Sequence, residues 1–399
     1  MLIRSRVPLP WLNLTHDKGR LVFRVLGTAF AVLLLFVEQG FWDALREAPV
    51  QLIRKFNGPL IIVSQAHYAL NVKEPFSRRR LEQARAVAGV EQAYPIYLEH
   101  PSALWKDTSV PLGERSASQP IRVIAFSPDH PVLNIEEVNV DRASLKVPYN
   151  ILLDRKSKEK IYGNIQKYLD PDTKPPELAG HAVRVAGLFT LGTDFANDGN
   201  VITSAETFAR LFGEGLPNEY VLDHADVGVV QVAANANVQE LYKSLQQILP
   251  TDVRVFTKEE FIKREQEYWS KTTPIGFIFF LGLCVGFIVG AVICYQIIST
   301  DVTEHLPQFA TLKAIGYSNA FLCGMVLREA LWLALIGFVP GWGLSWLLYW
   351  QLSRAIGLPM EMTPQRVLLV AFFTILMCMV SGLLALSKVR TADPAEVFG

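Results

Sequence analysis

From Ile275 to Ile298 the chain carries no charged side chain. About 20 apolar residues in a helix are enough to cross the hydrocarbon core of a bilayer. A bilayer offers no water to the backbone, so a stretch of this length has to satisfy its own hydrogen bonds as a helix. We therefore predict a transmembrane helix over residues 274–299, and the rest of the fold must be compatible with a membrane.

Three further apolar stretches are long enough to span a bilayer, at residues 21–42, 322–350 and 367–386. No small-residue cleavage site follows the first of them, which favours a retained anchor over a signal peptide. The third span contains Pro340, Gly337, Gly341 and Gly343. Glycines let another helix approach closely, and this composition is compatible with plain lipid-facing packing as well as with a hinge.

The charges at the two ends of the chain predict its orientation. Residues 1–20 carry Arg4, Arg6, Lys18 and Arg20 against one acid, Asp17, which favours a cytoplasmic N-terminal segment lying on the inner face of the membrane. Four spans return the tail, residues 387–399, to the same side. Residues 43–271 are then expected on the outside as a periplasmic domain. A mean hydropathy of +0.24 agrees with such a mixture of spans and water-facing chain.

The outer residues alternate between strand and helix patterns, which predicts a mixed α+β domain. Two strand–helix–strand units, near Leu60–Leu98 and near Val230–Phe256, are expected to form two lobes, with a more strand-rich section inserted between them. Thr257 and Glu260 form a capping-box pattern at the start of a helix. We expect that helix to run through Lys271 into the second span unless Pro274 breaks it.

The connection between the second and third spans, residues 301–318, does not have the composition of a flexible loop. Its apolar residues recur at every third position, at Leu306, Phe309, Leu312 and Ile315. This spacing predicts a short amphipathic helix. Gly316 is expected to end it and Ser318 to cap the next helix. The apolar face could fit a groove on a partner or lie on lipid headgroups, and the spacing leaves both open.

No motif for catalysis is present. The sequence has no phosphate-binding G-x-x-x-x-G-K-[ST], no H-E-x-x-H and no G-x-S-x-G. No metal-ligand spacing is found, and 38 basic against 38 acidic residues give no reason to expect a nucleic-acid partner. We expect a non-catalytic protein without a metal or cofactor of its own. Arg328 and Glu329, at the entrance of the third span, are interpreted as an interfacial pair or a contact to the short helix.

The C-terminal third resembles the FtsX/MacB family of ABC transporter permeases. The resemblance rests on Glu304 and Lys313-Ala-Ile-Gly316 in the connection, on the third and fourth spans, and on the closing Arg390-x-x-Asp393-Pro394-x-Glu396. Within the family the chain is most similar to the DevC-type permeases of cyanobacterial exporters, through Pro10–Leu14, Phe36–Phe41 and Gly187–Thr193. It departs from MacB, in which an ATPase domain is fused to the permease.

This resemblance implies a four-span inner-membrane permease with a large MacB-like periplasmic domain of porter-like lobes and an inserted strand-rich subdomain. The connection becomes the coupling helix that docks on an ATPase, through Glu304, Leu306, Phe309, Ala310, Leu312, Lys313, Ile315 and Gly316. ATP and Mg²⁺ would be held by that separate, DevA-like subunit. Further implied partners are a second copy of the chain, a DevB-like periplasmic adaptor and a TolC-like outer-membrane channel.

The implied function is export by mechanotransmission in a tripartite efflux pump, with a glycolipid or another amphiphile as substrate. An alternative within the same family is a signalling subunit that couples an ATPase to a periplasmic cell-wall hydrolase, as FtsX does. The large size of the outer domain favours the pump.

Overall fold

The computed structural model describes residues 18–109, 118–213, 215–357 and 359–391. The chain divides into two compact units. The membrane unit comprises Met1–Asp43, Phe277–Ser353 and Met360–Gly399, and the outer domain comprises Ala44–Gly276 and Arg354–Pro359. Most of the predicted N-terminal segment and of the predicted C-terminal tail lies outside the described residues.

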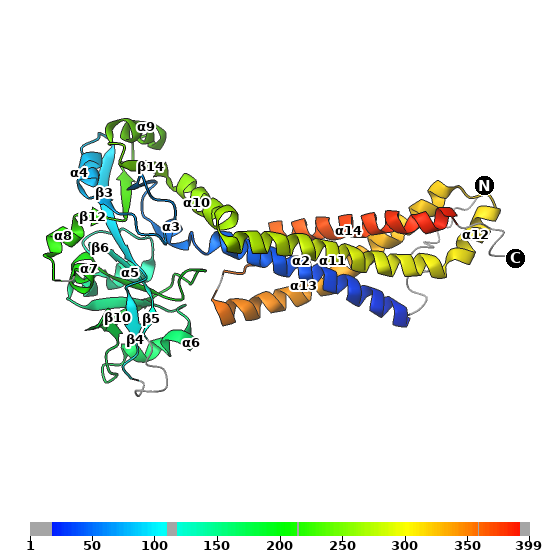
Figure 1. Cartoon of the computed structure of the whole chain (residues 1–399), viewed down its shortest axis with the longest axis horizontal. Coiled ribbons are helices and arrows are strands. Elements are labelled where there is room, and N and C mark those ends of the chain that lie inside the picture. The colour runs from blue at the N-terminus through cyan, green and yellow to red at the C-terminus, as the bar shows by residue number, and fades with distance from the viewer. Residues whose placement is uncertain (1–17, 110–117, 214, 358, 392–399) are drawn as a thin grey trace. The chain divides into compact units, whose positions relative to one another are not determined.

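Four long helices build the membrane unit and run alongside one another (Figure 1). They are α2 (Lys18–Glu47), α11 (Pro274–Glu304), α13 (Asn319–Ile356) and α14 (Pro364–Thr391). All four are long and apolar enough to cross a membrane. Each predicted span lies inside one of these helices, and the helices extend beyond the predicted spans.

Two glycines of α13 bring this helix against α2. A Cβ atom at Gly337 would lie 2.6 Å from Thr28 Cβ, and one at Gly341 would lie 2.7 Å from the main-chain oxygen of Ala29. Any larger residue would therefore push the two helices apart. The predicted close approach is confirmed at these two positions. It is wrong for Gly343, where a Cβ would meet no atom within 4 Å.

An eight-stranded mixed sheet forms the centre of the outer domain, in the order β10-β7-β11-β6-β3-β13-β1-β14. Its strands are β1 (Leu60–Ser64), β3 (Val90–Glu99), β6 (Arg122–Phe126), β7 (Asn150–Asp154), β10 (Arg184–Phe189), β11 (Asn200–Ser204), β13 (Val227–Val232) and β14 (Val253–Thr257). Two small sheets flank it, made by β2 (Phe76–Ser77) with β12 (His224–Ala225), and by β5 (Gln119–Pro120), β4 (Leu104–Lys106), β8 (Glu177–Leu178) and β9 (His181–Ala182).

The strand order corrects the predicted division into lobes. β1 pairs with both β13 and β14, and β13 pairs with β3, all antiparallel. The first and last strand–helix–strand units therefore interlock into one lobe, with the split βαβ arrangement, instead of forming two. The inserted section supplies the other lobe through β6, β11, β7 and β10, and β3 joins the two lobes by pairing with β6.

Side chains alternate between two cores on the two faces of this sheet. In β1, Leu60 and Ile62 belong to one core and Ile61 and Val63 to the other, as the period of two along a strand requires. The helices of the outer domain are α3 (Gln51–Lys55), α4 (Arg79–Arg85), α5 (Glu136–Asp141), α6 (Glu159–Tyr162), α7 (Ala205–Phe212), α8 (Asn218–Leu222), α9 (Val238–Ile248) and α10 (Lys258–Glu267), with 3₁₀ turns at Arg142–Lys146 and Ile165–Leu169. Helices α4, α7 and α9 cover the first core, and α3, α5 and α10 cover the second.

The predicted continuous helix from the outer domain into the second span is interrupted. The capping box of Thr257 and Glu260 is present and starts α10. A π-helical turn at Tyr268–Thr272 follows, and Thr273 then adopts an extended conformation with φ −85° and ψ 147°. Pro274 begins α11. Because proline restricts the residue before it to extended backbone, Thr273 is where the helix breaks.

A buried carboxyl on α10 fastens this helix to the chain that follows β1. Glu265 is 2 % exposed and accepts the main-chain N–H of Leu70 with both oxygens, at 3.2 and 3.1 Å. Trp269 Nε1 donates to the same carboxyl group at 3.0 Å. Burial outweighs these hydrogen bonds and raises the pKa of Glu265 from its usual 4.5 to about 7.

This carboxyl should make the stability of the outer domain depend on pH. A group that binds its proton more tightly in the folded state stabilises the fold below its unfolded pKa, and the contribution is lost as the pH rises through the folded pKa. We expect the free energy of unfolding of the full chain to fall by up to about 3 kcal/mol between pH 4.5 and 7. This magnitude follows because each unit of pKa shift between the unfolded and the folded state corresponds to about 1.4 kcal/mol.

Glu265→Gln should flatten this dependence in chemical unfolding followed by tryptophan fluorescence. Glu259→Gln is the matched control, because Glu259 is an exposed residue of the same helix. Equal pH slopes in Glu265→Gln and in the unchanged chain would show that Glu265 does not titrate in this range.

Candidate functional site

The connection between α11 and α13 forms a stiff elbow. Its helix, α12, runs over Leu306–Ala314, and residues 301–304 belong to the end of α11. Gly316 ends α12 at φ +105°, a conformation that glycine adopts without strain. The N–H of Gly316 donates to the carbonyl of Lys313 at 3.0 Å and that of Tyr317 to the carbonyl of Leu312 at 3.1 Å. These two bonds form a Schellman motif, so the predicted end of the helix is confirmed.

Ser318 starts the next helix as predicted. Its hydroxyl accepts the N–H of Phe321 at 3.3 Å, immediately before α13 begins at Asn319. Few rotatable bonds therefore separate α12 from α13. A force on α12 would move the start of α13 with it.

The protein's own helices cover much of the predicted apolar face of α12. Phe309 and Ala310 are buried, at 4 % and 1 % exposed, and Phe309 belongs to a core cluster with residues of α11, α13 and α14. Leu306 and Leu312 are half-buried, and Lys313 is partly covered. Among the four apolar residues of the predicted face, Ile315 alone is exposed, at 70 %. The long helices of the same unit therefore cover part of the predicted docking face, and docking of this face on a partner stays a prediction.

An ion pair inside the membrane unit anchors the end of α11 to α2. Arg24 of α2 pairs with Asp301 of α11, and their side chains are 12 % and 6 % exposed. One turn towards the N-terminus, Arg20 Nη1 lies 2.5 Å from Glu304 Oε2, in a more exposed pair. His305 Nδ1 lies 2.9 Å from the main-chain oxygen of Asp301. The end of α11, directly before α12, is thus held against the first helix by Asp301 and Glu304.

Glu329 brings α13 to the same cluster. Its carboxyl group is buried, 8 % exposed, and lies near Asp301 and Arg24. Arg328 is exposed instead. Arg328 and Glu329 were interpreted as an interfacial pair or as a contact to the short helix; Glu329 instead lies near the end of α11. Arg24, Asp301 and Glu329 join three helices at the base of the elbow; we call them the ionic anchor.

The exposed apolar side chains of the elbow lie at its tip. They are Ile315, Tyr317 and Phe321, exposed by 70, 45 and 41 %. The rings of Tyr317 and Phe321 contact each other, with centroids 4.7 Å apart. We call these three residues the tip patch. Glu304, predicted as a docking residue, pairs with Arg20, and Gly316 shapes the turn beneath the patch.

Sequence reasoning missed Arg24, Asp301 and the aromatic part of the tip patch. A signal existed for Arg24, because an arginine one turn inside a predicted span needs a partner. The identity of that partner, 277 positions further along the chain, follows only from the packing of the helices. Tyr317 and Phe321 lie on either side of the predicted cap Ser318. They do not belong to the series of apolar residues at every third position from which the face was predicted.

Part of the chain, from the start of α11 onwards, matches a known family. Residues 275–394 match the family described as FtsX-like permease C-terminal. The match begins at the start of α11 and includes the elbow and both later helices. This region of the chain is therefore of the FtsX-like permease type.

Two solved structures are similar to the outer part of the chain. The periplasmic region of MacB from Actinobacillus actinomycetemcomitans is 12 % identical, with 53 % of this chain and 94 % of that chain covered and a TM-score of 0.37. The extracellular domain of the noncanonic ABC-type transporter YknZ from Gram-positive bacteria is 15 % identical, with 50 % and 99 % covered and a TM-score of 0.33.

The ionic anchor can be tested by reversing its charges. Removing one partner of a buried pair leaves an uncompensated charge and typically costs about 3–5 kcal/mol. Arg24→Asp and Asp301→Arg should each lower the thermal stability of the chain in detergent sharply, and the double reversal should recover part of the loss. Arg20→Ala is the control, because exposed pairs contribute only about 0–1 kcal/mol. A double variant as unstable as the sum of the single ones would show that the two residues do not act as a pair.

Proposed function

Since residues 275–394 are an FtsX-like permease region, we propose that this chain is the permease subunit of an ABC transporter and acts by transmitting force. The observation that supports this most is the elbow. It is a short helix closed by a Schellman motif, capped directly into α13 and tied to α2 by the ionic anchor. A short rigid helix that is anchored to its neighbours can transmit a force to several helices at once.

In this proposal a separate ATPase holds ATP and Mg²⁺ and docks on the tip patch. When the ATPase closes on ATP, it moves the elbow. Phe309, packed among α11, α13 and α14, and the Arg24–Asp301 pair then carry the displacement into the long helices. The helices continue along the chain into the outer domain, where the motion acts on the substrate. The chain itself performs no catalysis and binds no cofactor.

The finer proposal is a DevC-type permease in the inner membrane, with its outer domain in the periplasm. A homodimer would work with a DevA-like ATPase, a DevB-like adaptor and a TolC-like outer-membrane channel, and would export a glycolipid or another amphiphile. Its support is the sequence resemblance described above and the size of the outer domain, which spans 44–276. Signalling to a cell-wall hydrolase is the competing function, and crosslinking distinguishes the two: the pump requires capture of an adaptor by the outer domain.

Docking at the tip patch predicts a specific loss of partner. Ile315 is largely exposed, so Ile315→Asp should leave the fold intact while placing a charge in an apolar contact. An anchoring residue typically contributes about 2 kcal/mol or more, which corresponds to roughly 30-fold in affinity. We expect a pull-down from native membranes to retain a P-loop ATPase with the unchanged chain and to lose most of it with Ile315→Asp.

Leu216→Asp is the matched control, because Leu216 is similarly exposed, at 62 %, but lies in the outer domain. It should retain the ATPase. Phe309→Asp is not a suitable variant, since a charge at this buried position would disrupt the membrane unit. Equal recovery of the ATPase with Ile315→Asp and with the unchanged chain would contradict docking at the tip patch.

A further inference from the structure

The short connection between α13 and α14 packs closely on the outer domain. Its residues Arg354–Pro359 belong to the same compact unit as the large sheet. Gly357, directly after the last residue of α13, has φ +77°, a left-handed conformation that favours glycine. A Cβ atom at Gly357 would lie 2.8 Å from Oγ1 of Thr193, a buried residue. The connection therefore touches Thr193 so closely that a larger residue at position 357 would separate them.

Thr193 belongs to a loop that hydrogen bonds fix to one lobe of the sheet. We call β1, β3, β13 and β14 the first lobe and β6, β7, β10 and β11 the second lobe. The loop, residues 190–199, joins β10 to β11. Asp154, the buried last residue of β7, accepts the N–H of Leu191 at 3.1 Å and that of Gly192 at 2.8 Å. The part of the loop directly before Thr193 is thus held to the second lobe.

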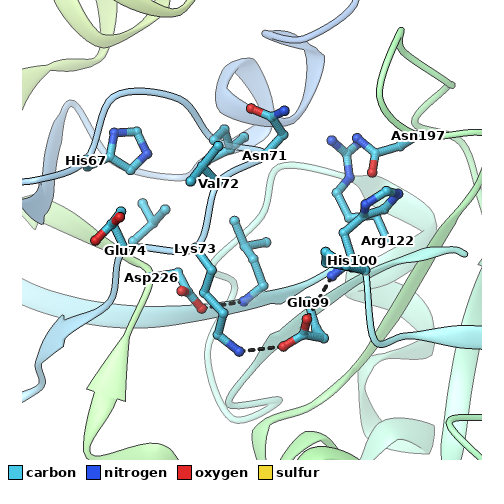
Figure 2. Close-up of a pocket in the computed structure, with 14 residues that line it drawn as sticks. His67, Asn71, Val72, Lys73, Glu74, Glu99, His100, Arg122, Asn197 and Asp226 are labelled. Carbon is cyan, nitrogen blue, oxygen red and sulfur yellow. Dashed lines mark hydrogen bonds and ion pairs between the residues drawn. The ribbon is translucent and has the colours of Figure 1, made fainter.

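A second buried carboxyl group fixes the part of the loop after Thr193. Through Oδ1, Asp194 accepts the N–H groups of Ala196 and Asn197, both at 2.8 Å. Its Oδ2 lies 2.8 Å from Nη1 of Arg122, the first residue of β6, in a buried ion pair. Figure 2 shows Arg122 beside Asn197. Buried and satisfied polar networks of this kind are rigid, so a force on Thr193 is passed to β6 and β7.

The chain that follows the first long helix meets the same loop. A Cβ atom at Gly192, the neighbour of Thr193, would lie 2.6 Å from Oε1 of Gln51. Gln51 is the first residue of α3, which follows α2 after a short turn. The loop therefore has close contacts with chain segments that continue from two of the long helices, α2 and α13.

Two helices of different continuity link the elbow to the two lobes. α13 runs unbroken from Asn319, directly after the cap Ser318, to Ile356, and Pro340 lies inside it without ending it. α11 leads from the other end of the elbow back to α10 and to β14 of the first lobe, but the π-helical turn at Tyr268–Thr272 interrupts this route. A push on the elbow would therefore reach the second lobe through a continuous helix and the first lobe through a broken one.

The boundary between the lobes leaves room for a relative movement. In the sheet, the lobes are joined by three residue pairs, Tyr97–Glu99 of β3 with Val123–Ala125 of β6. A cavity of about 60 Å³ lies beside this junction (Figure 2). Leu98 and Asp226 of the first lobe and Arg122 of the second lobe contribute to its lining. Because this boundary is not filled, a small shift of one lobe does not have to compress a close-packed core.

We propose that the contact between Gly357 and Thr193 is the point at which α13 moves the second lobe relative to the first. The inference rests on the proposed function, because it requires a partner that pushes the elbow. A displacement of α13 passes through the contact into the loop, and Asp154 and Asp194 carry it into β7 and β6. Gly357 and Thr193 are positioning residues in this account, and neither contacts a substrate.

The contact itself is tested by hydrogen exchange in the full chain in lipid nanodiscs, without an ATPase. Gly357→Ala should push the connection away from the loop, so that the amides of Leu191–Asn197 exchange at least about tenfold faster. Gly180→Ala is the matched control. Gly180 has nearly the same backbone conformation, φ +78°, but a Cβ atom there would meet no atom within 4 Å. It introduces the same backbone strain without the collision.

Should Gly357→Ala fail to fold, Thr193→Ala serves instead. It shortens the side chain on the other side of the contact and should also speed up exchange in the loop. Exchange rates of Leu191–Asn197 that are the same in the contact variant and in Gly180→Ala would overturn the proposal, whatever the partner of the chain is.

The transmission is tested on the full chain together with the P-loop ATPase that co-purifies with it from native membranes. The four native cysteines are replaced, and spin labels are attached at Arg210→Cys and Lys243→Cys. Arg210 is exposed on α7, which follows β11 of the second lobe, and Lys243 is exposed on α9, which precedes β14 of the first lobe. ATP with orthovanadate should change the distance between the labels in the otherwise unchanged chain and in Gly180→Ala, but not in Gly357→Ala.

The outcomes separate this inference from the proposed function. An equal change of the label distance in Gly357→Ala would overturn the inference and leave force transmission by the chain intact. A label distance that ATP changes in none of the chains would overturn both. A change that is lost only in Gly357→Ala would support both, because the ATPase then still acts on the chain while the second lobe no longer follows.

Discussion

The buried pair of Arg24 with Asp301 is the interaction on which the membrane unit depends most. A charge inside a bilayer is costly unless it is paired, so α2 and α11 are constrained to meet where these two residues meet. The buried carboxyl group of Glu329, on α13, lies near this pair. The elbow begins within a few residues of Asp301, and its position is therefore defined relative to three helices at once. An otherwise uniform apolar surface would leave the helices free to slide and rotate.

The periodicity and length of the apolar segments were sufficient to predict the four long helices, the mixed outer domain and several helix ends. These features are local: an uncharged stretch such as Ile275–Ile298, or a cap such as Thr257 with Glu260, acts within a few residues. The lobes could not be predicted in the same way. β1 pairs with β13 and β14 across most of the outer domain, and a strand pattern does not say which distant strand completes it.

The same distinction applies to the candidate site. Gly316 and Ser318 were predictable because turn and cap chemistry depends on adjacent residues. The face of α12 was predicted as apolar, and it is apolar, but a sequence pattern does not tell whether such a face meets a partner or its own chain. Phe309 is buried within the unit, which moves the exposed apolar surface to the tip patch.

The proposed mechanism requires that the elbow faces the cytosol, where a nucleotide-driven partner can reach it, while the outer domain faces the opposite side. The most direct measurement is the labelling of single cysteines in intact cells, with the four native cysteines replaced, by a maleimide that does not cross the inner membrane. Gln308, exposed on α12, and Tyr220, exposed in the outer domain, are suitable positions. The account predicts labelling at position 220 in intact cells and at position 308 only after the cells are opened. Labelling at position 308 in intact cells would contradict it.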